Sequence, residues 1–236
     1  MTATMSGRFV CLEGIDGAGK TTAAAVVHDF LRRRQARVAL LDKHGVAFPS
    51  AYVDEHMKRL HDLIWGHPGD DPYLLMGDWH WIHLQAAWYE AVSHCVVAPL
   101  LKSGTLVVTD TWTHKFLAKL ALRPLDVDRA RSLFDGVVKP DLVIRFDIDP
   151  VTAARRKGTF GISESGNHEG DVDLTGAGFV DYQRRVGQVL TQLGDAPSWV
   201  ALDVNGLTVP QTAAAVVEII TDRFPESVPA RTPRLR

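Results

Sequence analysis

The sequence predicts an α/β fold in which one open parallel β-sheet has helices on both faces. Five apolar runs rich in Val, Leu, Ile or Phe alternate along the chain with segments of helical pattern. A glycine-rich loop joins the first apolar run to the first helical segment. Alternation of this kind, with right-handed crossovers, produces parallel sheets that are covered on both faces.

Each apolar run is long enough to form one strand. Strands that are buried on both faces are continuous in Val, Ile and Leu instead of alternating between apolar and polar residues. The five expected strands are residues 8–13, 37–42, 105–110, 141–147 and 198–203.

Three expected helices begin with a capping side chain that is closely followed by proline. The capping side chain accepts a hydrogen bond from the first turn, where the N–H group that proline lacks would be unsatisfied anyway. The first of these starts opens a long helical segment that Gly104 closes. The three starts are Asp71-Pro72, Asp149-Pro150 and Thr208 with Pro210.

The 236 residues fit one sizeable domain, which we expect to span residues 1–224. Two segments do not follow the alternation of strands and helices. Residues 157–178 contain six glycines and almost no apolar periodicity, which is typical of a mobile lid. Residues 225–236, with three prolines and three arginines, are expected to form a disordered tail.

The composition excludes several classes of function. A formal net charge of -2 provides no electrostatic attraction for a nucleic acid polymer or an anionic membrane. No apolar run reaches the roughly 18 residues that a spanning helix needs, and the polar start MTATMSGR does not resemble a signal peptide. The two cysteines, Cys11 and Cys95, are expected to be reduced, which favours the cytoplasm.

Residues 9–22 read FVCLEGIDGAGKTT and fit the phosphate-binding pattern G-x-x-x-x-G-K-[ST]. Glycines let several N–H groups turn toward one anion, and the N-terminus of the following helix adds a positive dipole. Lys20 is expected to reach the β- and γ-phosphates of ATP, and the hydroxyl of Thr21 to ligate Mg²⁺. The expected nucleotide-binding residues are Gly14, Ile15, Asp16, Gly17, Ala18, Gly19, Lys20, Thr21 and Thr22.

A carboxylate stands at the end of the third expected strand, where the run TLVVTD ends in Asp110. Phosphoryl transfer needs an acid beside the metal, and Asp110 could hold a Mg²⁺-bound water or orient the acceptor. An aspartate that only caps the next helix would produce the same sequence. We therefore predict a metal site at Thr21 and Asp110, with the capping role as its alternative.

These motifs resemble those of the thymidylate kinase family of P-loop kinases. The family pattern F-x-x-x-E-G-x-D-G-x-G-K-T-T matches residues 9–22, and P-D-L…D-x-x-P-x-x-A-x-x-R matches PDLVIRFDIDPVTAARR at residues 140–156. The resemblance implies a P-loop NTPase-type α/β fold with strand order 2-3-1-4-5 and a lid. It also implies a homodimer that uses ATP and Mg²⁺, with Asp16 hydrogen-bonded to a sugar hydroxyl of the acceptor.

The positions that hold the acceptor in the family carry other residues here. The arginine of the family's D-R-Y is Thr111, followed by Trp112, and the family's S-x-x-A-Y-Q becomes KFLAKL from Lys115 onward. The base-reading Phe and Arg of L-L-F-x-A-x-R correspond to Met76 and His80. The expected acceptor-binding residues are Asp16, Lys43, His44, Met76, His80, Thr111, Trp112 and Lys115.

The missing arginine has a cost that can be estimated. A buried phosphate without its arginine fork loses roughly 3–5 kcal/mol unless another cation substitutes. Near the end of the second expected strand, the family's T-R-E-P-G-G becomes DKHG, in which Lys43 is the plausible cation. His44 and His80 could also substitute in part, so the loss disfavours a monophosphate acceptor without excluding it.

Many members of the family place arginines in the lid to stabilise the transferring phosphoryl group. Residues 158–178 contain no Lys or Arg, so Arg155 and Arg156 at the N-terminal hinge of the lid are the remaining candidates. Charges on a solvent-facing helix would produce the same pattern.

Three hypotheses about function follow. The first is an ATP- and Mg²⁺-dependent kinase that phosphorylates a hydroxyl of a small molecule other than dTMP, with Asp110 or Asp16 as the base. An amino-sugar or nucleoside-like acceptor would suit the carboxylates Asp70, Asp71 and Asp78 beside a Trp-rich helix. The second is a diverged nucleoside monophosphate kinase that converts dTMP to dTDP. The third is a nucleotide-binding regulatory protein without kinase activity, which the intact phosphate-binding motif disfavours.

Overall fold

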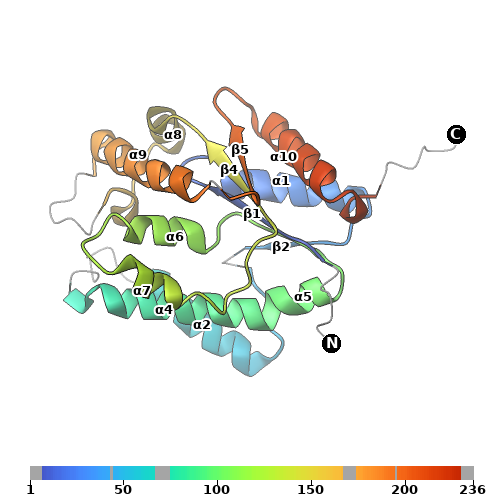
Figure 1. Cartoon of the computed structure of the whole chain (residues 1–236), viewed down its shortest axis with the longest axis horizontal. Helices are drawn as coiled ribbons and strands as arrows, with labels where there is room; N and C mark the ends of the chain where they lie inside the picture. The colour runs from blue at the N-terminus through green and yellow to red at the C-terminus, as the bar shows by residue number, and fades with distance from the viewer. Residues whose placement is uncertain (1–6, 43–44, 67–74, 167–173, 195, 230–236) are drawn as a thin grey trace, which may run out of the picture.

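The structure is a computed structural model that describes residues 7–42, 45–66, 75–166, 174–194 and 196–229 (Figure 1). Its centre is one five-stranded sheet in the order β2-β3-β1-β4-β5, with every neighbouring pair parallel. The strands are β1 Phe9–Gly14, β2 Val38–Leu41, β3 Leu106–Thr109, β4 Leu142–Asp147 and β5 Trp199–Asp203. The predicted fold class and strand order are therefore confirmed, and each predicted strand end lies within one residue of the observed one.

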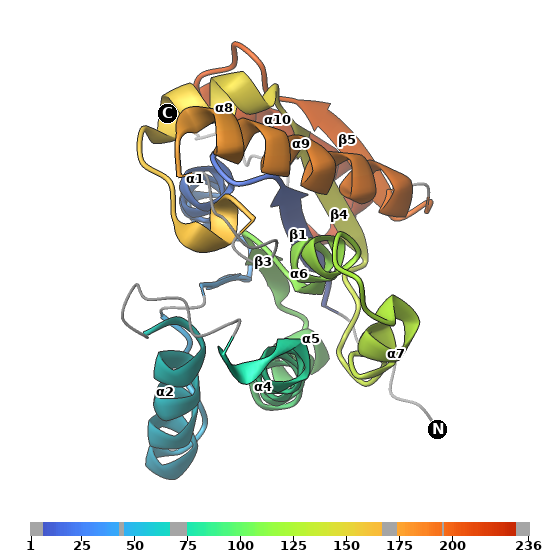
Figure 2. The same cartoon turned by 90° about the vertical axis from the view of Figure 1, so that its left-hand side faces the viewer.

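Helices connect the strands and cover both faces of the sheet. In Figure 2, α2 and α4 lie side by side on one side of the molecule, and α8 and α9 lie together on the opposite side. A π-helical stretch, Ser93–Val97, joins α4 to α5. The α-helices are α1 Lys20–Arg33, α2 Ala51–Trp65, α4 Asp78–Val92, α5 Ala98–Lys102, α6 Thr113–Leu120, α7 Val127–Ser132, α8 Pro150–Lys157, α9 Gly176–Leu193 and α10 Val209–Arg223.

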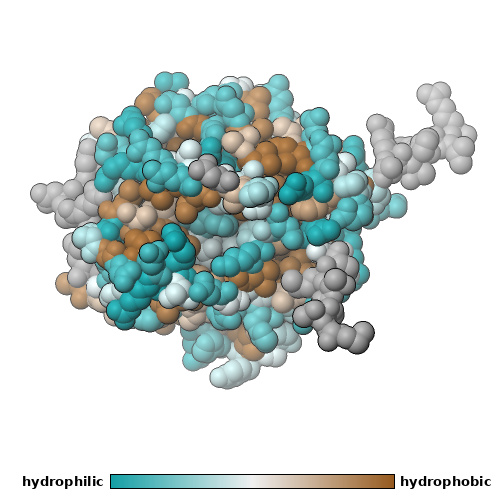
Figure 3. All heavy atoms as spheres, viewed as in Figure 1, coloured by the Kyte–Doolittle hydropathy of each residue, from teal (hydrophilic) through white to brown (hydrophobic). Residues whose placement is uncertain are grey.

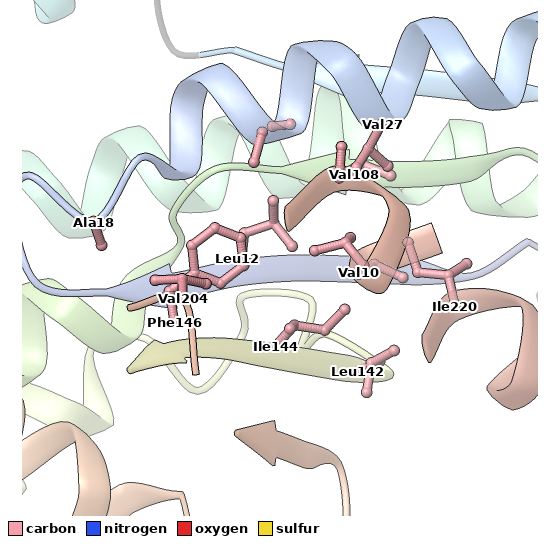
Figure 4. Close-up of a cluster of buried hydrophobic side chains, with 14 of the residues drawn as sticks. Val10, Leu12, Ala18, Val27, Val108, Leu142, Ile144, Phe146, Val204 and Ile220 are labelled. Carbon is pink, nitrogen blue, oxygen red and sulfur yellow. The ribbon is translucent and has the colours of Figure 1, made fainter. Parts of the chain in front are cut away.

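Successive residues of β1 point to opposite faces of the sheet, because side chains alternate along a strand. Val10 and Leu12 belong to one buried cluster together with Val27 of α1 and Ile220 of α10 (Figure 4). This cluster holds α1 against the sheet. The start of α1, which carries the predicted phosphate-binding residues Lys20, Thr21 and Thr22, is therefore fixed by the core.

Phe9 and Cys11 belong to a second buried cluster on the opposite face, with Ile82 of α4 and with Trp112 just beyond β3. Trp112 meets Phe9 edge to face at a centroid distance of 5.1 Å, an arrangement that aromatic rings favour. The cluster fixes α4 and the end of β3 relative to β1. These are the elements that surround the acceptor positions.

Two of the three predicted helix starts are confirmed. Asp149 caps α8, where its carboxylate accepts the N–H of Thr152 at 3.0 Å. Thr208 caps α10 within a capping box, in which Gln211 accepts the N–H of Thr208 at 2.9 Å. The third predicted start, at residues 71–72, lies outside the described residues, whereas Gly104 follows the end of α5 with a φ of 79° as expected.

Ordered structure extends further into the C-terminal segment than the sequence suggests. Residues Pro225–Ser227 form a 3-10 helix, and Val228 is buried. Arg8 holds this turn, because its guanidinium lies over the Phe224 ring and pairs with Glu226 at 3.1 Å. The prediction of disorder is wrong for this first part of the tail, and residues 230–236 lie outside the described residues.

Part of the expected lid, residues 157–178, also has regular secondary structure. Its first residue, Lys157, ends α8, and Ile162–Glu164 form a 3-10 helix. Helix α9 begins at Gly176, so the last residues of the expected lid belong to a helix. Residues 167–173 of this segment lie outside the described residues.

Hydrophilic residues surround smaller hydrophobic areas on the face shown in Figure 3. Among the helices of the described chain, none combines the length and the hydropathy that crossing a membrane would require.

The cap of α10 provides a test of the fold. Replacing Thr208 with Ala should lower the free energy of unfolding by about 1 kcal/mol, because an N–H group of the first turn loses its acceptor. Urea denaturation measures this change. Thr208→Ser keeps the hydroxyl and should unfold like the wild type. Equal stability of the Ala variant and the wild type would contradict the capping role.

Candidate active site

The phosphate-binding loop lies between β1 and α1, and two of its glycines could not be replaced without strain. Gly17 has a φ of 81°, and a Cβ atom there would lie 2.8 Å from the carbonyl oxygen of Ala153. Gly19 has a φ of 86° at the N-terminus of α1. Residues with side chains rarely adopt this backbone conformation. The glycine-rich motif therefore adopts a tight loop that depends on its glycines, as a phosphate-binding loop requires.

Lys20 lies inside this loop. Its Nζ atom donates to the carbonyl oxygens of Gly14 and Ile15 at 2.9 and 2.7 Å, and the residue is 7% exposed. Burial, and then the charge of Lys115, lower the pKa of Lys20 to about 8, although Asp16 and nearby acids oppose the shift. The ammonium group is therefore charged at neutral pH and is held within the loop by its own carbonyl oxygens.

Thr21 and Asp110 lie together, as the sequence predicts. The hydroxyl of Thr21 donates a hydrogen bond to the carboxylate of Asp110, which follows β3. A hydroxyl and a carboxylate are hard oxygen ligands of the kind that Mg²⁺ prefers. These two side chains fit the role of holding Mg²⁺ beside the nucleotide phosphates.

Asp16, the carboxylate of the loop, accepts hydrogen bonds from three side chains. It accepts from Lys115 at 2.6 Å, from Lys119 at 3.0 Å and from Gln183 at 3.2 Å. Burial alone would raise the pKa of Asp16, but the charges of Lys115, Lys119 and Lys20 hold that pKa well below its usual range. A carboxylate held so firmly as an anion is a weak proton acceptor, which disfavours the predicted role of Asp16 as a base.

A cavity of about 210 Å³ opens beside Asp16, between α4, α6 and the 3-10 helix of the lid segment. Aromatic residues form much of its wall, and cationic side chains lie on α6 and just beyond it. Its lining residues are Asp16, Trp65, Trp81, Ile82, Gln85, Tyr89, Thr111, Trp112, Lys115, Phe116, Lys119, Leu120, Arg123, Ser163 and Glu164.

Half of the eight predicted acceptor residues line this cavity, and two others do not. Asp16, Thr111, Trp112 and Lys115 belong to its wall. Met76 and His80 are absent from it, and Met76 is 53% exposed. The other two predicted acceptor positions, residues 43–44, lie outside the described residues.

The face of α4 that lines the cavity includes residues that were not predicted, Gln85 and Tyr89 among them. It presents Trp81, Gln85 and Tyr89, which lie four residues apart and so share one side of the helix. This spacing is visible in the sequence, but it does not reveal whether that side faces the sheet or the cavity. Tyr89 also donates to the carbonyl oxygen of Trp112 at 3.2 Å, which fixes α4 against the end of β3.

The two arginines predicted to stabilise the transferring phosphoryl group do not line this cavity. Arg155 is exposed on α8, and Arg156 donates to the carbonyl oxygen of Val204 at 3.2 Å, beyond the end of β5. In the described part of the chain, the cations that form ion pairs with Asp16 come from α6 instead. Lys119 additionally donates to the carbonyl oxygen of Ser163 at 2.8 Å, which ties α6 to the lid segment.

The carboxylates that suggested a cationic acceptor do not make the cavity acidic. Asp78 pairs with Arg123, and residues 70–71 lie outside the described residues. Glu164, the other acid of the wall, pairs with Lys157 at 3.0 Å. Beside these pairs, Lys115 and Lys119 both form ion pairs with Asp16, at 2.6 and 3.0 Å.

Fold and loop together place the chain among the P-loop kinases, which are ATP-dependent phosphotransferases. A thymidylate kinase of Burkholderia cenocepacia is 31% identical over 172 residues, which are 70% of this chain and 78% of that protein. One from Burkholderia ambifaria is 28% identical over 212 residues, covering 87% and 93% of the two chains. A probable thymidylate kinase of Archaeoglobus fulgidus is 28% identical over 149 residues, covering 63% and 68%.

The chain therefore belongs to the thymidylate kinase family. No protein-family model matches it.

The lowered pKa of Lys20 predicts a pH-dependent affinity for ATP. An ordinary lysine stays charged up to a pKa near 10.4, but Lys20 loses its proton above about 8. Bound phosphates favour the charged form, so binding above that pH must take up a proton. The Kd for a non-hydrolysable ATP analogue should therefore rise by up to about tenfold per pH unit above pH 8.

Calorimetric titrations at pH 6.5 to 9.5 measure this change. Lys20→Ala should bind the analogue weakly and with a nearly flat pH dependence, because the titrating group is gone. A wild-type Kd that stays constant between pH 7 and 9.5 would contradict the assignment of Lys20.

Proposed function

We propose that the protein transfers the γ-phosphoryl group of ATP to the phosphate of a nucleoside monophosphate, with dTMP as the expected acceptor. The pair of lysines on α6 carries this proposal. Lys115 and Lys119 line the cavity, and both pair with the carboxylate of Asp16, at 2.6 and 3.0 Å. A phosphate dianion that enters the cavity would meet both ammonium groups, and hydrogen bonds between charged partners are stronger than neutral ones.

Lys115 also offsets the absence of arginine at Thr111. It lies four residues further along the chain, in the first turn of α6, and lines the same cavity as Thr111. A lysine binds phosphate as a point charge without the geometry of an arginine fork. The cost of losing that arginine is therefore smaller than the sequence alone suggests.

The lack of a suitable general base among the described residues also favours a phosphate acceptor over a hydroxyl acceptor. A hydroxyl acceptor must lose its proton during transfer, which requires a basic side chain within reach. Asp16 is held as an anion by three charged neighbours, and Asp110 accepts the hydroxyl of Thr21. An acceptor phosphate is already anionic, so its oxygen can attack the γ-phosphorus without a base.

On the donor side, the phosphate-binding loop and Lys20 would hold the β- and γ-phosphates. Thr21 and Asp110 would hold Mg²⁺, which neutralises charge on the nucleotide phosphates. During transfer, an acceptor oxygen forms a bond to the γ-phosphorus while the bond to the bridging oxygen of ADP breaks. The residues named here position the reactants and stabilise charge without forming a covalent bond to them.

The relatives named as thymidylate kinases support dTMP as the acceptor. The departures at Thr111, Met76 and His80 keep another acceptor as the second candidate, since they concern the positions that read the acceptor in the family. A homodimer, a cytoplasmic location, a single domain spanning residues 1–224 and a mobile lid at residues 157–178 stay predictions.

An ADP-coupled assay with dTMP, other nucleoside monophosphates, thymidine and amino sugars tests this function. We expect kcat/KM for dTMP within the ordinary enzyme range of about 10⁴–10⁸ M⁻¹s⁻¹ and no turnover of thymidine. Turnover of an amino sugar without turnover of any monophosphate would establish the first hypothesis instead. Slow ATP hydrolysis that no acceptor accelerates would favour the regulatory protein.

The lysines themselves can be tested by substitution. Lys115→Met should lower kcat/KM for dTMP by about a hundredfold, because a buried phosphate loses a charged partner. Lys139→Met serves as the matched control, since Lys139 is exposed and pairs loosely with Asp135. It should leave kcat/KM unchanged. If Lys115→Met had no greater effect than the control, the lysines would not be the phosphate site.

A further inference from the structure

Gln85 is a buried polar residue in the wall of the acceptor cavity whose amide oxygen lacks a partner. The residue is 7% exposed, and its Oε1 atom has no hydrogen-bond donor among the described residues. A buried acceptor without a donor is destabilising, and such groups are rare in native proteins. This arrangement is expected where a ligand supplies the donor.

The surroundings of Gln85 suit a flat ring. Trp81 and Tyr89 lie one turn before and one turn after it on α4, and all three line the cavity. Trp112 and Phe116 contribute to the same wall from the end of β3 and from α6. Aromatic walls of this kind bind ring systems by stacking and by edge contacts.

A second buried oxygen lies in the same wall. The Oγ1 atom of Thr111 is buried and has no hydrogen-bond partner in the described part of the chain. A hydroxyl can both donate and accept. Gln85 and Thr111 therefore add two polar oxygens, without partners among the described residues, to a wall that also carries the charges of Lys115 and Lys119.

We propose that Gln85 is the residue that determines base specificity, by pairing with a ring N–H group and the carbonyl next to it. Its Oε1 would accept from the ring N–H, and its Nε2 would donate to the carbonyl oxygen. Imide and lactam rings such as thymine, uracil and guanine present this pair of groups. The inference rests on the proposed nucleoside monophosphate kinase activity and adds the chemistry by which the base is read.

This assignment shifts the base-reading position along α4. Met76 is largely exposed and His80 does not line the cavity, whereas Gln85, further along the helix, does. A site built to hydrogen-bond a ring discriminates strongly against an analogue that lacks the donor, because its own polar groups are then left unpaired.

The test compares dTMP with its N3-methyl analogue, in which the ring N–H is blocked. Wild-type protein should prefer dTMP by at least about thirtyfold in kcat/KM. Gln85→Met keeps the length of the side chain and removes both polar groups. It should raise the KM for dTMP about tenfold, change kcat little, and reduce the preference to within about threefold.

Gln85→Glu provides a second variant that distinguishes base reading from a structural role. It keeps an acceptor for the ring N–H, loses the donor to the carbonyl, and adds a negative charge. Its affinity for dTMP should fall while its preference over the N3-methyl analogue persists. A merely structural residue would lower both activities equally and leave the preference unchanged in every variant.

Gln192→Met, the same substitution at an exposed position of α9, is the matched control and should behave like the wild type. Thermal melting confirms that each variant is folded, and quenching of tryptophan fluorescence by dTMP measures binding independently of turnover. If Gln85→Met retained the full preference for dTMP, the inference would be overturned while the kinase function stood. A wild-type protein that turned over no nucleoside monophosphate would overturn both.

Discussion

The carboxylate of Asp16 joins the phosphate-binding loop to two helices that the chain reaches much later. It accepts from Lys115 and Lys119 of α6 and from Gln183 of α9, and the backbone N–H of Asp16 donates to Gln183 at 2.9 Å. Lys115 lies 99 residues further along the chain than Asp16. The loop is therefore held by tertiary contacts as well as by its glycines, and a phosphate that binds the lysines would compete with the carboxylate that positions the loop.

Because these groups are buried, their charges act on one another strongly. Lys115 lowers the pKa of Lys20, whereas Asp16 raises it. An acceptor that brings negative charge would offset the two lysines of α6 and favour the charged form of Lys20, which holds the donor. A neutral acceptor would do neither. Under the proposed function, donor binding and acceptor binding would thus be linked through one cluster of charges.

The cavity beside Asp16 carries residues that could take over the roles of those lost from the family's acceptor positions. At the family's arginine position stands Thr111, yet Lys115 places a cation in the same wall. The family's base-reading positions correspond to Met76, which precedes α4, and to His80 in its first turn, yet Gln85 of α4 contributes an amide to the cavity wall. A comparison of single aligned positions records the lost residues and overlooks Lys115 and Gln85, which line the same cavity from other positions.

The sequence by itself determined the five strands to within one residue, the phosphate-binding loop, two helix caps and the family, because each depends on short patterns of apolar, glycine or capping residues. Only the tertiary structure decided that Lys115 and Lys119 face Asp16, that Arg123 neutralises Asp78, and that Arg8 orders the turn after α10. These pairings join segments that are distant in the chain. Their energy depends on burial and separation, which follow from the packing of helices on the sheet and are encoded in no local pattern.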